Sequence, residues 1–89
     1  MDWIDKKFGV KRVIVGYEKD PGSKPVVEYG FKEEIKLGKL QALFNEEADH
    51  PMFDCYQLDE QQAYKLQPLV IGKIDLNKYD FFLEAYQHD

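Results

Sequence analysis

The alternation of apolar and polar residues predicts a β-hairpin near the start of this chain. Within residues 10–18, every second position from Val13 to Tyr17 is apolar, and the segment is rich in β-forming residues, which is typical of a strand. Residues 27–32 repeat the alternation, and residues 20–25 between them read DPGSKP, a composition typical of a turn. The alternating apolar residues are Val13, Val15, Tyr17, Val27, Tyr29 and Phe31. Because an isolated hairpin is marginally stable in water, other elements must cover its apolar face.

Two amphipathic helices are predicted after the hairpin. Apolar residues recur at three-to-four spacing between Leu37 and Asn45, as in a helix that lies across a sheet. Asp59 and Gln62 have the spacing of a capping box, and Pro68 should end or kink the helix that they start. The residues expected to face the sheet are Leu37, Leu40, Leu43 and Phe44 in the first helix, and Ala63, Leu66 and either Leu69 or Val70 in the second.

Residues 79–86 fit either a strand or a helix. As a strand, the segment has an apolar face and a face that mixes carboxylates with aromatic rings. The first face carries Tyr79, Phe81, Leu83 and Ala85, and the second carries Asp80, Phe82, Glu84 and Tyr86. As a helix, the segment has an apolar stripe formed by Tyr79, Phe82, Leu83 and Tyr86. The aromatic content favours the strand and the Leu-Glu-Ala sequence favours the helix, and we predict a strand.

Together these elements predict an α+β fold of order ββααβ. A small antiparallel sheet, made of the N-terminal β-hairpin and the C-terminal strand, carries two helices on one face. Residues 1–9 fit a helical turn or an arm packed on the sheet, and the sequence leaves both open. A length of 89 residues corresponds to a single domain over residues 1–89.

The charge of the chain is unevenly distributed. Residues 1–44 contain nine Lys and Arg against seven Asp and Glu, whereas residues 45–89 contain three against ten. The acidic second half disfavours direct nucleic-acid binding and favours a basic protein partner. The start of the chain lacks the features of a signal peptide, and no apolar run is long enough to span a membrane, so we expect a cytoplasmic protein without a membrane partner.

The residue types that could carry catalysis or metal binding form no persuasive pattern. His50 and Cys55 are five residues apart, but the neighbouring carboxylates should raise the pKa of the thiol, so we expect a buried structural cysteine. The candidate metal ligands are His50, Asp54, Cys55 and His88, which lack the paired spacing of a zinc site. Residues 75–79 resemble the start of a calcium loop without its glycine and final glutamate. We therefore predict no metal, no cofactor and no catalytic residue.

Acidic side chains interleaved with tyrosines are the remaining candidate for function. Interfaces favour tyrosine anchors, and carboxylates select a basic partner. The candidate partner-binding residues are Glu46, Glu47, Asp49, Asp54, Tyr56, Asp59, Glu60, Asp80, Glu84 and Tyr86. The competing interpretation is that these carboxylates only solubilise the protein and that the tyrosines lie at the edge of the core.

Several short strings resemble a group of small bacterial proteins similar to immunity proteins of toxin systems, including contact-dependent growth inhibition. The strings are PMFDCY at residues 51–56 and IDLNKYDFFLEAY at residues 74–86, together with Leu40, Leu43 and Phe44 in the first predicted helix and Gln62, Ala63, Leu66 and Gln67 in the second. The resemblance implies a cytoplasmic protein that binds and blocks a cognate toxin domain, often a nuclease with a basic cleft, in a 1:1 complex. It supplies no catalytic motif.

Three hypotheses follow for the function of the chain. The first is an immunity protein that binds a basic toxin domain through its acidic aromatic surface. The second is a small enzyme that uses His50 and Cys55. The third is an adaptor or a self-associating domain, in which residues 79–86 form an isologous contact. We favour the first.

Overall fold

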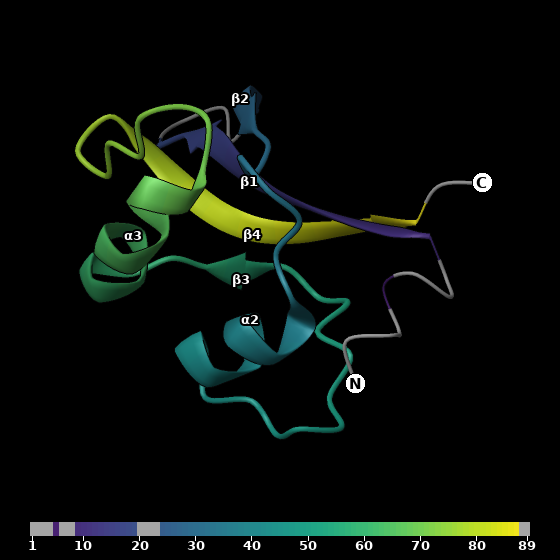
Figure 1. The fold of residues 1–89 in the computed structure, drawn as a ribbon. Coiled ribbons are helices and arrows are strands. Elements are labelled where there is room, and N and C mark those ends of the chain that lie inside the picture. Colours follow the sequence, from purple (N-terminus) through teal and green to yellow (C-terminus); the bar gives the residue numbers. More distant parts are fainter. Residues whose placement is uncertain (1–4, 6–8, 20–23, 88–89) are drawn as a thin grey trace.

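A four-stranded antiparallel sheet forms the frame of the protein. The computed structural model describes residues 5, 9–19 and 24–87. The strand order is β2-β1-β4-β3, so the C-terminal strand lies beside the first strand of the hairpin (Figure 1). The strands are β1 (Val10–Glu18), β2 (Pro25–Tyr29), β3 (Tyr56–Gln57) and β4 (Tyr79–Gln87). The predicted hairpin and the predicted addition of the C-terminal strand are both confirmed.

Two short helices and a 3₁₀ turn complete the fold. They are α2 (Leu37–Leu43), α3 (Glu60–Leu66) and η1 (Gln67–Leu69). The predicted capping box starts α3, because Gln62 donates its backbone N–H to Asp59 Oδ1 at 2.8 Å and accepts from the Asp59 N–H at 3.0 Å. Pro68 falls within the 3₁₀ turn that ends this helix, as its missing N–H predicts.

The C-terminal run is a strand, and the helical alternative is wrong. β4 pairs with β1 along its whole length, with Leu83 opposite Ile14 and Phe81 opposite Gly16. The alternation places Phe81 and Leu83 toward the helices, where they are 0% and 1% exposed. Leucines of both helices belong to the same buried cluster, so α2 and α3 cover one face of the sheet (Figure 1).

The structure departs from the sequence prediction at β3 and at the end of the hairpin. β3 is a two-residue edge strand on β4, which is too short to show a periodicity in the sequence. The second hairpin strand ends at Tyr29 rather than at residue 32, because Phe31 forms a bridge with Val70. The Lys32 N–H donates to the Leu69 carbonyl at 2.8 Å and closes this connection.

Some sequence predictions lie outside the described residues. These are most of residues 1–9, the centre of the turn at residues 20–23, and the candidate ligand His88. Among the helices that the structure does describe, none is long and apolar enough to cross a membrane.

Candidate protein-binding surface

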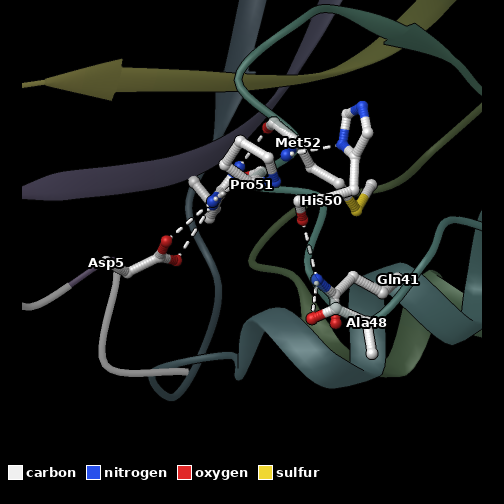
Figure 2. Close-up of polar contacts among 7 residues, drawn as sticks. Asp5, Gln41, Ala48, His50, Pro51 and Met52 are labelled. Atoms are coloured by element: carbon white, nitrogen blue, oxygen red, sulfur yellow. Dashed lines mark hydrogen bonds and ion pairs between the residues drawn. The ribbon is translucent and has the colours of Figure 1, made fainter. Parts of the chain in front are cut away.

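The acidic loop, which we define as residues 46–54, runs from α2 to β3 and is held from within by Gln41. The Gln41 side chain points into the loop, and the residue is only 5% exposed. Its amide nitrogen donates to the carbonyl oxygens of Ala48 at 3.1 Å and of His50 at 2.7 Å (Figure 2). A buried donor that binds two backbone acceptors of one loop restricts the conformations that the loop can adopt.

Arg12 fixes the other end of the acidic loop. Its side chain, 2% exposed, comes from β1 and donates to the carbonyl oxygens of Pro51, at 2.8 Å, and of Met52. It also forms a bidentate pair with the Asp5 carboxylate, at 2.9 Å and 2.6 Å (Figure 2). Met52 is fully buried and has a positive φ of 54°. The loop is therefore tied to both α2 and the sheet.

Inside the loop, Glu46 joins two further side chains. Its Oε2 accepts from the Tyr56 hydroxyl at 2.5 Å and lies 3.6 Å from His50 Nε2. Burial of the ring, followed by the hydrogen bond to Glu46, raises the pKa of Tyr56. The Tyr56 ring also packs on Phe44, with 5.3 Å between the ring centroids. Tyr56 thus helps to hold the acidic loop in place from β3.

The second half of the predicted surface lies on the outer face of the sheet, which we define as the face opposite α2 and α3. Glu84 lies at its centre and accepts from the hydroxyls of Tyr17 and Tyr86, the latter at 3.3 Å. Val13 and Val15 beneath these side chains are 1% and 2% exposed. Long aromatic side chains therefore shield this face where the described helices do not reach.

The two tyrosines on the outer face remain protonated well above their usual range. The hydrogen bond to Glu84, followed by burial, raises the pKa of Tyr17 to about 12. Burial, followed by the charge of Glu84 and a hydrogen bond to Glu28, raises the pKa of Tyr86 to about 12. Both hydroxyls consequently act as neutral donors to a charged carboxylate.

Cys55 connects the acidic loop to the outer face. Burial raises the pKa of its thiol first, and the charges of Glu84 and Asp54 raise it further. The predicted direction of the shift is confirmed, but the prediction of a buried cysteine is wrong, because Cys55 is exposed. It immediately precedes β3, the last strand at this edge of the described sheet. The loop and the outer face thus meet around this edge of the sheet.

The His50 ring makes its polar contacts with Met52 and Glu46 and not with Cys55. Its Nδ1 accepts from the Met52 N–H at 3.0 Å, and its Nε2 faces Glu46. The charges that act on the thiol come from carboxylates and not from His50. Within the part of the chain that the structure describes, no group of three or more His, Cys, Asp and Glu side chains could hold a metal ion.

The ten predicted binding residues fall into three places. Those of the acidic loop are Glu46, which is partly buried, and Glu47, Asp49 and Asp54, which are exposed; Tyr56 follows on β3. Asp59 and Glu60 are exposed at the start of α3, where Asp59 serves as the cap. Those of the outer face are Asp80, Glu84 and Tyr86.

Glu84 departs from the expectation of an exposed carboxylate. It is 7% exposed, because the side chains of Tyr17 and Tyr86 flank it and donate to it. Arg12, Gln41 and Tyr17 also belong to the surface, although they were not among the predicted residues. For Tyr17 the expectation was wrong: it alternates with Val13 and Val15, which the sequence predicts to lie on the covered apolar face, but the register places all three on the outer face. The two buried donors, Arg12 and Gln41, carried no signal.

A comparison with known protein families identifies the family of this chain. Residues 11–84 match the model of a domain of unknown function, DUF7683. The chain belongs to this family. The DUF7683 match includes Arg12, Tyr17, the whole acidic loop and Glu84, and it ends before Tyr86. No curated protein and no solved structure matches the chain.

Proposed function

We propose that this chain is an immunity-type protein, which binds a basic toxin domain and blocks it in a 1:1 complex. The observation that carries the proposal is the acidic loop, whose exposed carboxylates are mounted on a backbone tied down by Arg12 and Gln41. A preformed loop loses little conformational entropy on binding, which favours tight association.

The proposed mechanism is electrostatic mimicry of a nucleic-acid backbone. A nuclease cleft must be basic to hold phosphates, so a surface with fixed carboxylates competes for the same cleft. Glu47, Asp49 and Asp54 are exposed and supply the charges. The charges speed the encounter and select the partner, while aromatic groups beside them supply buried contact area. Such a protein acts in the cytoplasm, where an incoming nuclease meets its substrate.

The inhibitory role needs no catalysis by this chain. The predicted pairing of Cys55 with His50 is not assembled, because His50 is held by Met52 and Glu46. The pKa of the Cys55 thiol is raised, which lowers its reactivity as a nucleophile. These observations support a binding protein over the small-enzyme hypothesis.

The test is a binding assay with the toxin domain encoded immediately upstream of this gene. We expect a stable 1:1 complex by size exclusion and loss of the toxin's activity. The double variant Glu47→Lys with Asp49→Lys should weaken binding by about 100-fold, because it reverses two charges at the interface.

The matched control is Glu33→Lys with Glu34→Lys. These two glutamates are also exposed and produce the same change in net charge, but they lie in the connection between β2 and α2. Equal losses of affinity for the two double variants would show a non-specific charge effect and refute the role of the acidic loop. A chain that binds no upstream domain and elutes as a dimer would refute the immunity-type function.

A further inference from the structure

A small cavity opens on the outer face of the sheet, next to the acidic loop. Its volume is about 280 Å³, just below the usual range for small-molecule sites of about 300–1,000 Å³. Its lining residues are Tyr17, Glu18, Cys55, Asp80, Phe82 and Glu84. The lining combines three carboxylates, two aromatic rings and a thiol, and among the described residues it includes no lysine or arginine. A cavity of this size suits one long side chain.

Within the part of the chain that the structure describes, the charge of Glu84 has no counter-ion. Its two hydrogen-bond donors, Tyr17 and Tyr86, are neutral hydroxyls. Across residues 5, 9–19 and 24–87, Glu84 forms no ion pair. A carboxylate that is 7% exposed and faces only neutral donors carries a desolvation cost that a cation would relieve. The cavity is therefore built for a positive group.

The aromatic walls favour the same kind of ligand. The rings of Tyr17 and Phe82 meet edge to face, with centroids 5.4 Å apart and an angle of 88°. An aromatic face attracts a cation through its quadrupole, and a planar guanidinium can stack on a ring while it pairs with a carboxylate. An arginine side chain can therefore pair with the carboxylate and stack on an aromatic ring at the same time. Lysine is less suitable, because its ammonium group is a compact, strongly hydrated charge that does not stack.

One lysine of the chain already lies at the rim of the cavity. Lys19 Nζ is 3.0 Å from Asp80 Oδ1, and the two side chains are 45% and 36% exposed. An exposed pair of this kind contributes little to stability, so an incoming arginine can displace Lys19 from Asp80. Lys19 pairs with Asp80 alone among the described carboxylates and leaves Glu84 uncompensated.

The charge of the outer face argues against a second copy as the occupant. An isologous contact would place Glu84 and Glu28 of one copy near the same carboxylates of the other. Like charges that face each other at an interface are unfavourable. The cavity also adjoins Asp54 through Cys55, so its surface is continuous with the loop proposed to meet a basic partner.

We propose that this cavity receives an arginine side chain of the partner protein, with its guanidinium on Glu84 and its plane against Phe82. The proposal rests on the proposed function for the identity of the partner, but not for the chemistry of the cavity. It divides the recognition surface into a charged loop that guides encounter and a pocket that anchors one residue.

The test is an NMR titration of the ¹⁵N-labelled full chain with N-acetylarginine methylamide. We expect saturable shifts at the amides of Tyr17, Cys55 and Phe82. N-acetylcitrulline methylamide, which has the same shape without the charge, should produce none. Glu84→Gln should weaken binding of the arginine probe by about tenfold, since it removes the charge and keeps the shape. Phe82→Leu should also weaken binding of the arginine probe, because it removes the aromatic ring and leaves the charge of Glu84 in place. This variant provides the test if Glu84→Gln fails to fold.

The control variant is Glu33→Gln, which removes an equal charge from the connection between β2 and α2 and should leave the affinity for the arginine probe unchanged. Equal responses to the arginine and citrulline probes, or unchanged affinity in both Glu84→Gln and Phe82→Leu, would overturn the proposal. Shifts that depend on protein concentration without any probe would instead show that a second copy occupies this face. Because no toxin enters this titration, its failure and that of the immunity-type function are separable.

Discussion

Both faces of the sheet contain buried residues, but water is excluded from them by different means. On the helix-covered face, Ile14, Phe81 and Leu83 pack against apolar side chains of α2, α3 and the loops. On the outer face, Val13 and Val15 are equally buried, yet tyrosines shield them and surround a carboxylate. The first face is closed by the fold itself, whereas the second is closed by side chains that a partner can contact.

This difference separates residues that hold the fold from residues that are available for binding. Hydrophobic burial stabilises in proportion to the apolar area removed from water, and the helix-covered face supplies most of it. The outer face contributes less and contains Glu84, a group that costs stability to bury. A buried group that costs stability without a structural need is a candidate for function. Pairs of adjacent residues on opposite faces test this division.

The largest contrast is expected between Phe81 and Phe82. Phe81 is 0% exposed and stacks on Tyr29, with centroids 5.9 Å apart, so Phe81→Ala should cost about 3–5 kcal/mol of unfolding free energy. Phe82 is only partly buried, and Phe82→Ala should cost about 1 kcal/mol. Urea denaturation measures both. Equal losses would mean that the outer face is a second core rather than a surface.

The next contrast is between Arg12 and Lys11. Arg12→Met removes the donor to the Pro51 and Met52 carbonyls and leaves the Asp5 carboxylate without its partner, which should cost about 3 kcal/mol. The control Lys11→Met makes the same change in charge at an exposed position and should stay within about 0.5 kcal/mol.

Hydrogen exchange gives the same contrast an independent readout. The Met52 N–H donates to His50 Nδ1 within the acidic loop, so its protection reports the order of that loop. Arg12→Met should lower the protection of this amide, and Lys11→Met should not. Full protection in a destabilised Arg12→Met would show that Gln41 alone orders the loop.

A smaller effect is expected where β1 approaches β4 through Gly16. A Cβ at this position would lie 2.7 Å from Val27 Cγ2 and 2.8 Å from Phe81 Cε1. Gly16→Ala should therefore cost about 1–3 kcal/mol through overpacking of the helix-covered face. Gly30→Ala is the control, because a Cβ there meets nothing within 4 Å. Thermal unfolding measures both, and a neutral Gly16→Ala would mean that Phe81 has room to move.

The fold was largely predictable because its elements carry local signals. The hairpin, α2 and β4 each show a period, and Asp59 with Gln62 marks the start of α3. β3 could not be predicted, because two residues have no period and their pairing is set by β4. Phe31 likewise continues the alternation of β2 but leaves the strand to pair with Val70, a contact that only the tertiary fold creates.

The candidate surface was less predictable than the fold. Its carboxylates were recognisable by composition, but what holds them comes from distant parts of the chain. Arg12 reaches Met52 over 40 residues, and Tyr17 reaches Glu84 over 67. Such partners depend on strand order and register, which a single sequence does not encode in any local pattern. The exposure of Cys55 has the same origin, since it depends on where β3 meets the sheet edge.

The smallest expected effect is a difference between the pKa changes of the two tyrosines that donate to Glu84. The hydrogen bond to Glu84 is the largest cause of the raised pKa of Tyr17, whereas burial is the largest cause for Tyr86. Glu84→Gln should therefore lower the pKa of Tyr17 from about 12 toward 10 and lower that of Tyr86 by less. Titration of the ¹³Cζ shifts of labelled tyrosines resolves the two residues. Equal decreases would mean that burial and charge act on both rings alike.

The same shifts fix the direction of the pH dependence of stability. Both tyrosines have a folded pKa of about 12 against an ordinary value of 10, so the folded state retains their protons more strongly than the unfolded state. Their contribution to stability is complete below pH 10 and is lost as the pH rises from 10 to about 12. Tyr17→Phe should flatten this alkaline loss in urea denaturation, because the phenylalanine has no proton to lose. An equally steep loss in that variant would place the alkaline sensitivity elsewhere than on the outer face.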